Sequence, residues 1–164
     1  MKKLLFLLVF IPLVSFGQED IERYKVYETT NIYTSLLLDT ATGKIWHLQI
    51  ATGDGDQLKY VLSDEQHAFT EEQITEEYNE DYKYWEETYN SKADSIVSAE
   101  SKSLWKPFPL ETRLAMSTIA KNGRFKLYPT GNMYNFIMVD VINGRTWQVQ
   151  WSTKENERLV LRFY

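Results

Sequence analysis

The chain repeats itself once, without a gap, at an offset of 101 residues. Residues 23–52 align with residues 124–153, and 11 of these 30 positions are identical. Unrelated segments of ordinary composition would share about two. The identical positions are Arg23, Lys25, Tyr27, Thr29, Asn31, Tyr33, Asp39, Gly43, Trp46, Gln49 and Thr52. Such a repeat is a duplication, and it predicts two copies of one small structural unit.

Each copy is expected to form three or four short antiparallel strands. They fall near 23–28, 33–39, 44–52 and 57–62 in the first copy, and near 124–128, 134–140, 145–153 and 157–163 in the second. Asp39 with Gly43, and Asp140 with Gly144, predict tight hairpins between the second and third strands. The Asp carboxylate accepts bonds from turn amides there, and Gly adopts the left-handed backbone. The shared residues are therefore those that a β-hairpin needs rather than those that a reaction needs.

Alternation along the third strand separates two faces. The face expected to be core holds Trp46, Leu48 and Ile50 in the first copy, and Trp147, Val149 and Trp151 in the second. The other face, expected to be mostly polar and solvated, holds Ile45, His47 and Gln49, and then Thr146, Gln148 and Gln150. The second strand is apolar on both faces, at 36–38 and 136–139. Another part of the structure is therefore expected to cover the second face of the sheet.

The segment between the copies predicts helices. From Thr70 the apolar period becomes 3.6, which predicts a helix over about 70–89. One stripe of this helix is expected to hold Ile74, Tyr78, Tyr82 or Asp81, Trp85 and Tyr89. Thr70 and Gln73 have the spacing of a capping box. A second, weaker helix is expected over 92–101, an irregular stretch at the prolines 107 and 109, and a turn at 122–123.

These patterns predict an α+β fold of one domain over residues 18–164. Two pseudo-symmetric antiparallel β-meander repeats, at 23–62 and 123–164, are expected to share one sheet or a small sandwich, because a three- or four-stranded unit is marginal alone. The helical insert at 64–122 is acidic and is expected to pack on one face of the sheets.

The first 17 residues have the form of a signal peptide. Two lysines precede an apolar run of 11 residues (4–14), and Ser15 and Gly17 stand where a signal peptidase needs small residues before Gln18. A membrane-spanning helix needs about 20 apolar residues, so a retained anchor is the weaker interpretation. The chain contains no cysteine, which excludes a lipoprotein anchor and disulfides. We expect a location in the periplasm or outside the cell.

Charge limits the partners. The formal net charge is -5, and residues 64–90 hold ten acidic residues against Lys83 alone. This balance argues against nucleic acid and anionic membrane surfaces as partners.

Two resemblances follow from the repeat. Asp39, Thr42, Gly43 and Trp46 resemble the blade signature of quinoprotein-type β-propellers, although Trp46 stands seven residues after Asp39 where that family usually has eight. Two copies are also too few to close a propeller ring. The whole repeat, and the Phe-Gly-Gln end of the signal at 16–18, is similar to short exported proteins of Bacteroidetes-type bacteria with a duplicated hairpin repeat. That second resemblance implies a compartment and no activity.

Catalytic motifs are scarce. The chain has no thiol and none of the common serine-hydrolase, metalloprotease, phosphate-loop or dinucleotide motifs, and we expect no cofactor and no catalytic or metal site. Asp39 and Asp140 could form a carboxylate pair for glycoside chemistry, but their place before the turn glycine explains them. Residues 53–56 resemble a calcium loop without its bidentate Glu, and a solvated loop is favoured.

The amides and the imidazole of the polar strand face are the best candidates for recognition. His47, Gln49, Gln148 and Gln150 are the predicted ligand-binding residues, because side chains on a rigid strand that donate and accept suit a neutral small ligand or a protein. The sequence thus favours an exported, non-catalytic binding or interaction protein. The alternatives are a hydrolase acting on a glycan or peptide, and an inhibitor or immunity-type partner whose acidic helix neutralises a basic protein.

Overall fold

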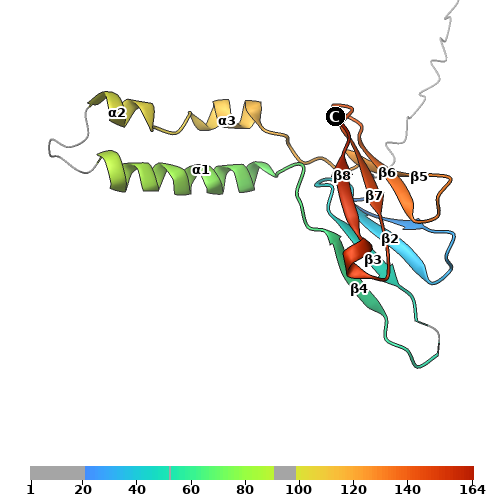
Figure 1. Cartoon of the computed structure of the whole chain (residues 1–164). Helices are drawn as coiled ribbons and strands as arrows, with labels where there is room; N and C mark the ends of the chain where they lie inside the picture. The colour runs from blue at the N-terminus through green and yellow to red at the C-terminus, as the bar shows by residue number, and fades with distance from the viewer. Residues whose placement is uncertain (1–20, 52, 91–98) are drawn as a thin grey trace, which may run out of the picture.

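The computed structural model describes residues 21–51, 53–90 and 99–164, and it contains two four-stranded antiparallel sheets and a set of helices (Figure 1). Sheet 1 has the order β1 (Tyr24–Glu28), β2 (Thr34–Asp39), β3 (Ile45–Gln49) and β4 (Leu58–Ser63). Sheet 2 has the order β5 (Phe125–Pro129), β6 (Asn135–Asp140), β7 (Thr146–Gln150) and β8 (Leu159–Arg162). The predicted α+β class with antiparallel strands is confirmed, and every strand lies within a few residues of its predicted range.

The strands form two separate sheets rather than one continuous sheet, and each sheet is a simple meander. The strand pairings agree at the offset of 101. Tyr24 is opposite Asp39 in sheet 1, and Phe125 is opposite Asp140 in sheet 2. In the same way Trp46 is opposite Leu37, and Trp147 is opposite Met138.

The predicted hairpin turns between β2 and β3 and between β6 and β7 are present. The Gly43 amide donates to the Asp39 carbonyl at 2.9 Å, and the Asp39 carboxylate accepts from the Ala41 amide at 3.0 Å. In the second turn Gly144 donates to Asp140 at 2.8 Å. Both glycines have positive φ, at 85° and 75°, which is the left-handed backbone that favours glycine.

The loops before β2 and β6 also use identical residues in the same way, which the sequence reading did not recognise. The Thr29 hydroxyl donates to the Thr34 carbonyl at 2.8 Å, and the Asn31 side chain accepts from the Tyr33 amide at 3.0 Å. Thr130 and Asn132 make the corresponding bonds at 2.9 and 3.0 Å. Side chains that satisfy local backbone groups fix the entry of each second strand.

The hydrophobic core combines residues of both sheets. Sheet 1 contributes Leu36, Leu38 and Ile45, sheet 2 contributes Phe125, Leu127, Phe136, Met138, Trp147, Val149 and Trp151 (the last directly after β7), and Ala68 joins from the segment after β4. Sheet 2 therefore buries the face predicted for it.

The face prediction is wrong for sheet 1. Ile45 and His47 are completely buried, whereas Trp46 and Leu48 are half-buried and Ile50 is exposed. The physical reason is that β3 carries large apolar side chains on both sides, so the alternation marks two faces without showing which one meets a partner. Packing against sheet 2 decides it, and sheet 2 covers the side of Leu36 and Ile45.

The helices are α1 (Glu71–Trp85), continued by the π-helical turn η1 (Glu86–Asn90), then α2 (Ala99–Leu104) and α3 (Leu110–Met116), and a 3-10 turn, η2 (Glu155–Glu157), precedes β8. The predicted capping box of α1 is confirmed, with the Gln73 amide donating to the Thr70 hydroxyl at 3.2 Å. Most of the helix predicted over 92–101 lies outside the described residues. Helix α3 was not predicted, because Pro109 was expected to lie in an irregular stretch, whereas it is the N-cap of that helix.

The helices of the insert do not pack on a face of the sheets, which corrects the prediction. Residues 70–90 and 99–117 form a helical arm that projects away from both sheets, with α1 antiparallel to α2 and α3 (Figure 1). The α1 stripe is covered within the arm: Trp85 Nε1 donates to the Lys102 carbonyl at 3.0 Å, and Arg113 pairs with Asp81 at 2.6 Å. Sheet 2, rather than the insert, covers the apolar face of sheet 1 that bears Leu36 and Leu38.

Among the described residues, none of the helices combines the length and the apolar character that crossing a membrane requires.

The two turn glycines allow a matched test. A Cβ on Gly43 would lie 2.9 Å from His67 Cδ2 and 3.3 Å from Phe125 Cδ1, whereas a Cβ on Gly144 would meet nothing within 4 Å. Gly144→Ala should therefore lower the free energy of unfolding by about 1 kcal/mol through backbone strain alone. Gly43→Ala should lower it by about a further 1 to 3 kcal/mol through overpacking. Denaturant unfolding of both variants measures this, and equal losses would contradict the packing around Gly43.

Candidate functional site

The structure does not bring the four predicted ligand-binding residues to one surface. His47 and Gln49 lie on the face of sheet 1 that meets sheet 2. Gln148 and Gln150 alternate with the core residues Trp147 and Val149, and so lie on the face of sheet 2 that points away from the core. The same positions in the two copies thus have different surroundings.

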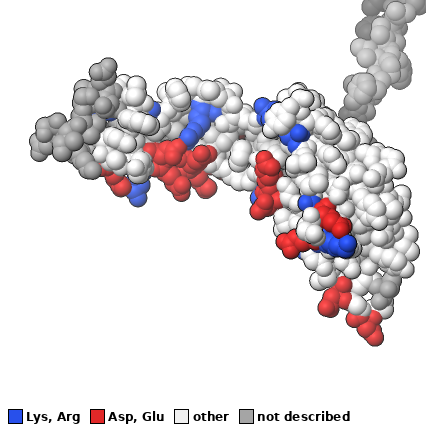
Figure 2. Space-filling view, in the orientation of Figure 1, with Lys and Arg blue, Asp and Glu red and all other residues white. Residues whose placement is uncertain are grey.

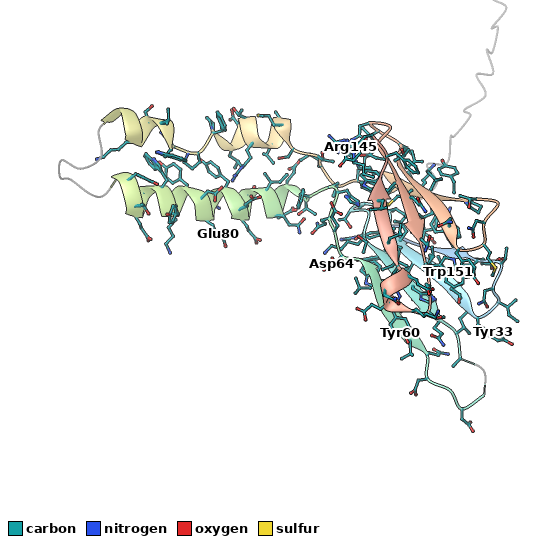
Figure 3. All side chains as sticks on the ribbon, in the orientation of Figure 1. Tyr33, Tyr60, Asp64, Glu80, Arg145 and Trp151 are labelled. Carbon is teal, nitrogen blue, oxygen red and sulfur yellow. The ribbon has the colours of Figure 1, made fainter. Side chains whose placement is uncertain are left out.

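His47 is a buried residue, and the prediction that it lies on a solvated strand face is wrong. Its ring lies 5.7 Å from that of Tyr60 and 5.5 Å from that of Trp151, two aromatic residues that Figure 3 labels on neighbouring parts of the two sheets. Both ring nitrogens are buried without a hydrogen-bond partner among the described residues. Burial lowers the pKa of His47, and the nearby Arg158 guanidinium lowers that pKa further. The imidazole is therefore neutral and fills space between the sheets.

The glutamines near the end of sheet 2 are used structurally. Gln150 Nε2 donates to the Glu157 carbonyl at 2.9 Å, and Gln148 Nε2 reaches Asn135 Oδ1 at 3.4 Å. Gln150 also lines a hollow of about 500 Å³, and Gln49 lines a neighbouring hollow of about 620 Å³. Asn31 is common to both hollows, which open where the loops of the two sheets meet.

Asp39 and Asp140 are occupied by their turns and by arginines. Asp140 accepts two bonds from the Arg124 guanidinium, at 3.0 and 2.9 Å, and both side chains are buried. Asp39 pairs with Arg23 at 3.2 Å, but Arg23 is half exposed. These contacts give both carboxylates a structural role. Among the described residues, no group of three or more His, Asp or Glu side chains is placed to hold a metal ion.

A basic recess of about 590 Å³ lies between the edges of the two sheets, and the sequence reading did not identify it. Lys25, Lys121 and Lys126 line it together with Arg124. Lys25 and Lys126 are counterparts in the repeat, which was the available signal. The three lysines are exposed, and the buried Arg124 already pairs with Asp140. The positive charge of the recess suits an anion, but none of the buried side chains that line it is free to bind one.

The helical arm carries a strongly acidic surface on α1 and η1. Residues 71–90 contain eight acidic residues and one lysine. Figure 2 shows acidic side chains gathered over α1, and Figure 3 shows Glu80 pointing away from α3. Hydrogen bonds from its own backbone amide and from Thr70 lower the pKa of Glu72, so this exposed carboxylate remains ionised.

The side of the arm formed by α2, α3 and the segment between them exposes large apolar side chains. They are Leu104, Trp105, Phe108 and Met116. Trp105 stacks on Tyr89 of η1, with 6.4 Å between ring centroids and 9° between planes. The arm thus combines an acidic edge with an apolar ridge.

Comparison with protein-family models, curated proteins and solved structures finds no match for this chain. Function is therefore argued from the geometry of these surfaces.

The buried histidines predict a pH dependence of stability. Burial also lowers the pKa of His67, partly offset by the carboxylates of Glu65 and Asp140. Below about pH 6.5 the unfolded chain therefore binds more protons at these sites than the folded protein does. The free energy of unfolding should therefore be highest above pH 6.5 and fall as the pH drops through this value, by at most about 1.4 kcal/mol per pH unit for each histidine.

His47→Gln provides the comparison, since glutamine occupies the counterpart position 148. Denaturant unfolding between about pH 7.5 and 5.5 should show a shallower loss of stability in this variant than in the wild type. The carboxylates titrate in both proteins and cancel in the difference. Parallel pH profiles would show that His47 accepts a proton in the folded state.

Proposed function

We propose that this chain is an exported, non-catalytic interaction protein whose helical arm docks a partner protein with a basic surface. The single observation that carries the proposal is the arm itself, which stands clear of the sheets (Figure 1) and exposes both an acidic edge (Figure 2) and the large apolar side chains of the ridge. An inhibitor or immunity-type role is the form that this takes if the basic partner is an enzyme.

The acidic edge reduces the stability of its own helix. Glu72, Glu76 and Glu80 follow one another at spacings of four residues, so their charges repel along one side of α1. Glu77 and Asp81, by contrast, lie 4.0 and 2.6 Å from Arg113 of α3. Among the described residues, Glu76 and Glu80 form no ion pair. A partner with lysines or arginines would supply the missing counter-charge.

The apolar ridge gives the second part of a docking surface. Exposed clusters of large apolar side chains mark interaction sites on soluble proteins, and Trp, Phe and Met are enriched in protein interfaces. Trp105 and Phe108 are both strongly exposed and lie close together in the chain. An acidic edge steers a basic partner, and burial of the ridge supplies affinity.

The remaining parts of the proposal rest on the sequence. The signal-like residues 1–17 support export to the periplasm or beyond, and they lie outside the described residues. The repeat at an offset of 101 and the matching strand registers support two pseudo-symmetric copies, stacked on one another as a single domain from residue 18 to 164.

Charge reversal on the arm tests the proposal. A photo-cross-linking residue in place of the exposed Tyr84, introduced in the cells that make the protein, should join α1 to a partner of basic surface charge. The combined change Glu72→Lys, Glu76→Lys and Glu80→Lys should reduce that product at least tenfold, because three attractive contacts of about 0.5 kcal/mol or more become repulsive.

The control carries the same charge change elsewhere. Asp54→Lys, Asp56→Lys and Glu155→Lys alter three exposed acids in loops of the sheets and should leave cross-linking intact. Circular dichroism checks that both variants keep their helices. Equal loss in both variants, or a partner without a basic surface, would contradict arm docking. Turnover of a glycan or peptide that is lost in a folded Asp39→Asn or Asp140→Asn variant would overturn the non-catalytic assignment.

A further inference from the structure

The two sheets bury opposite faces. In each sheet we call the side bearing Trp46 or Trp147 the Trp face, and the side bearing Gln49 or Gln150 the Gln face. Sheet 2 buries its Trp face and sheet 1 buries its Gln face, so the two surfaces that meet inside the chain are different. One Trp face, on sheet 1, and one Gln face, on sheet 2, remain uncovered by described residues.

The free Trp face of sheet 1 resembles the Trp face that sheet 2 buries. Tyr24 and Trp46 form an aromatic pair with 6.3 Å between ring centroids, and their counterparts Phe125 and Trp147 form the same pair at 6.0 Å. Phe125 is 0% exposed and Tyr24 is 49% exposed. Likewise Leu127 is 4% exposed, whereas its counterpart Val26 is 54% exposed. The Trp face of sheet 1 therefore carries aromatic and apolar side chains like those that sheet 2 buries, but no described residue covers them.

The free Gln face of sheet 2 matches the Gln face that sheet 1 buries. Leu36 and Leu38 are fully buried, and their counterparts Ile137 and Val139 are apolar and half-buried. In the adjoining turn, Ala41 is 6% exposed and its counterpart Ile142 is 59% exposed. On β6 and in the adjoining turn this face carries apolar side chains where sheet 1 buries them, whereas on β7 it carries the polar residues Thr146 and Gln148.

We propose that a second copy of this chain docks head to tail, with the Trp face of its sheet 1 on the Gln face of sheet 2. This goes beyond the proposed arm function and uses a different surface. The interface inside the chain supports this contact, because it is heterologous: two unlike surfaces meet, and one surface of each kind is left free. A contact of this type generates a closed ring or an open filament rather than a two-fold dimer.

The interface inside the chain predicts polar contacts for the one between copies. The Phe125 amide donates to the Thr40 carbonyl at 2.8 Å, which joins sheet 2 to sheet 1. The counterpart groups are the Tyr24 amide at the start of β1 and the Val141 carbonyl in the turn after β6. Arg23 pairs with Asp39 as Arg124 does with Asp140, yet its side chain is 50% exposed against 7% for Arg124. Docking would bury the Arg23 pair as the Arg124 pair is buried.

The contact between copies is expected to be the weaker one. Lys59 Nζ lies 4.3 Å from the centre of the Trp46 ring and must move aside. His67, which stacks on Trp147 at 4.5 Å, comes from the segment between β4 and α1 and belongs to the interface inside the chain. We therefore expect association in the micromolar range, which is common for contacts of modest size.

Two matched variants test the proposal. Val26→Glu with Val61→Glu places charge on the free Trp face, and Tyr128→Glu with Leu161→Glu places it on the free Gln face, at four side chains that are each about half exposed. In sedimentation equilibrium over about 1 to 200 µM, the wild-type mass should rise above that of one chain. Each variant alone should remain a monomer.

The decisive sample is the equimolar mixture. Each variant keeps the face that the other lacks, so the mixture should form a 1:1 pair and nothing larger, which also shows that both variants are folded. A monomeric wild type, a monomeric mixture, or a Gln-face variant that still self-associates would overturn the proposal. The arm variant with Glu72, Glu76 and Glu80 changed to Lys should self-associate as the wild type does, so failure of self-association and failure of arm docking are distinguishable.

Discussion

The packing of the aromatic face of sheet 2 on the aliphatic face of sheet 1 holds the rest of the structure. Phe125, Trp147 and Trp151 meet Leu36 and Leu38 in one buried cluster. A four-stranded meander has too little apolar surface on one face to be stable alone, and the chain contains no disulfide that could compensate. Burial of large aromatic side chains is therefore the main source of stability. The arm can project because sheet 2, rather than the insert, covers the buried face of sheet 1.

The same packing explains the chemistry of the buried polar groups. Arg124 and Asp140 lie in the interface, and the Arg124 Nη1 donates also to the Ile119 carbonyl at 2.7 Å, so the buried charges are paired and hydrogen-bonded. Removing one partner of such a pair costs several kcal/mol, about 3 to 5, because the other charge is left unpaired. Asp140 is thus a structural residue. His47 has no such partner, and burial lowers its pKa, which favours the neutral imidazole.

The strands, their turns and the start of α1 were predictable from the sequence, because each depends on local signals. Thr70 with Gln73 caps its own helix, and Asp39 with Gly43 closes its own turn. The faces of sheet 1 were not predictable, since Ile45 and Trp46 are both apolar neighbours and only the position of sheet 2 distinguishes them. The candidate site depended on that choice, and His47 was misplaced with it. The helical arm was not predictable either, because it depends on contacts between α1 and α3, and α3 was not expected.

The pattern of identity between the copies follows from these same contacts. The identical residues Thr29, Asn31, Asp39 and Gly43 serve loops and turns that are alike in both sheets. The positions that differ include those whose surroundings differ. Ile45 and His47 are fully buried under sheet 2, whereas their counterparts are polar residues, Thr146 and Gln148, on the uncovered face. Copies that stacked through equivalent faces would place both members of each pair in one environment. Identity at the turns, with divergence at positions 45 and 47 of the Gln face, is the pattern expected when the Gln face of sheet 1 is buried inside the chain and that of sheet 2 is not.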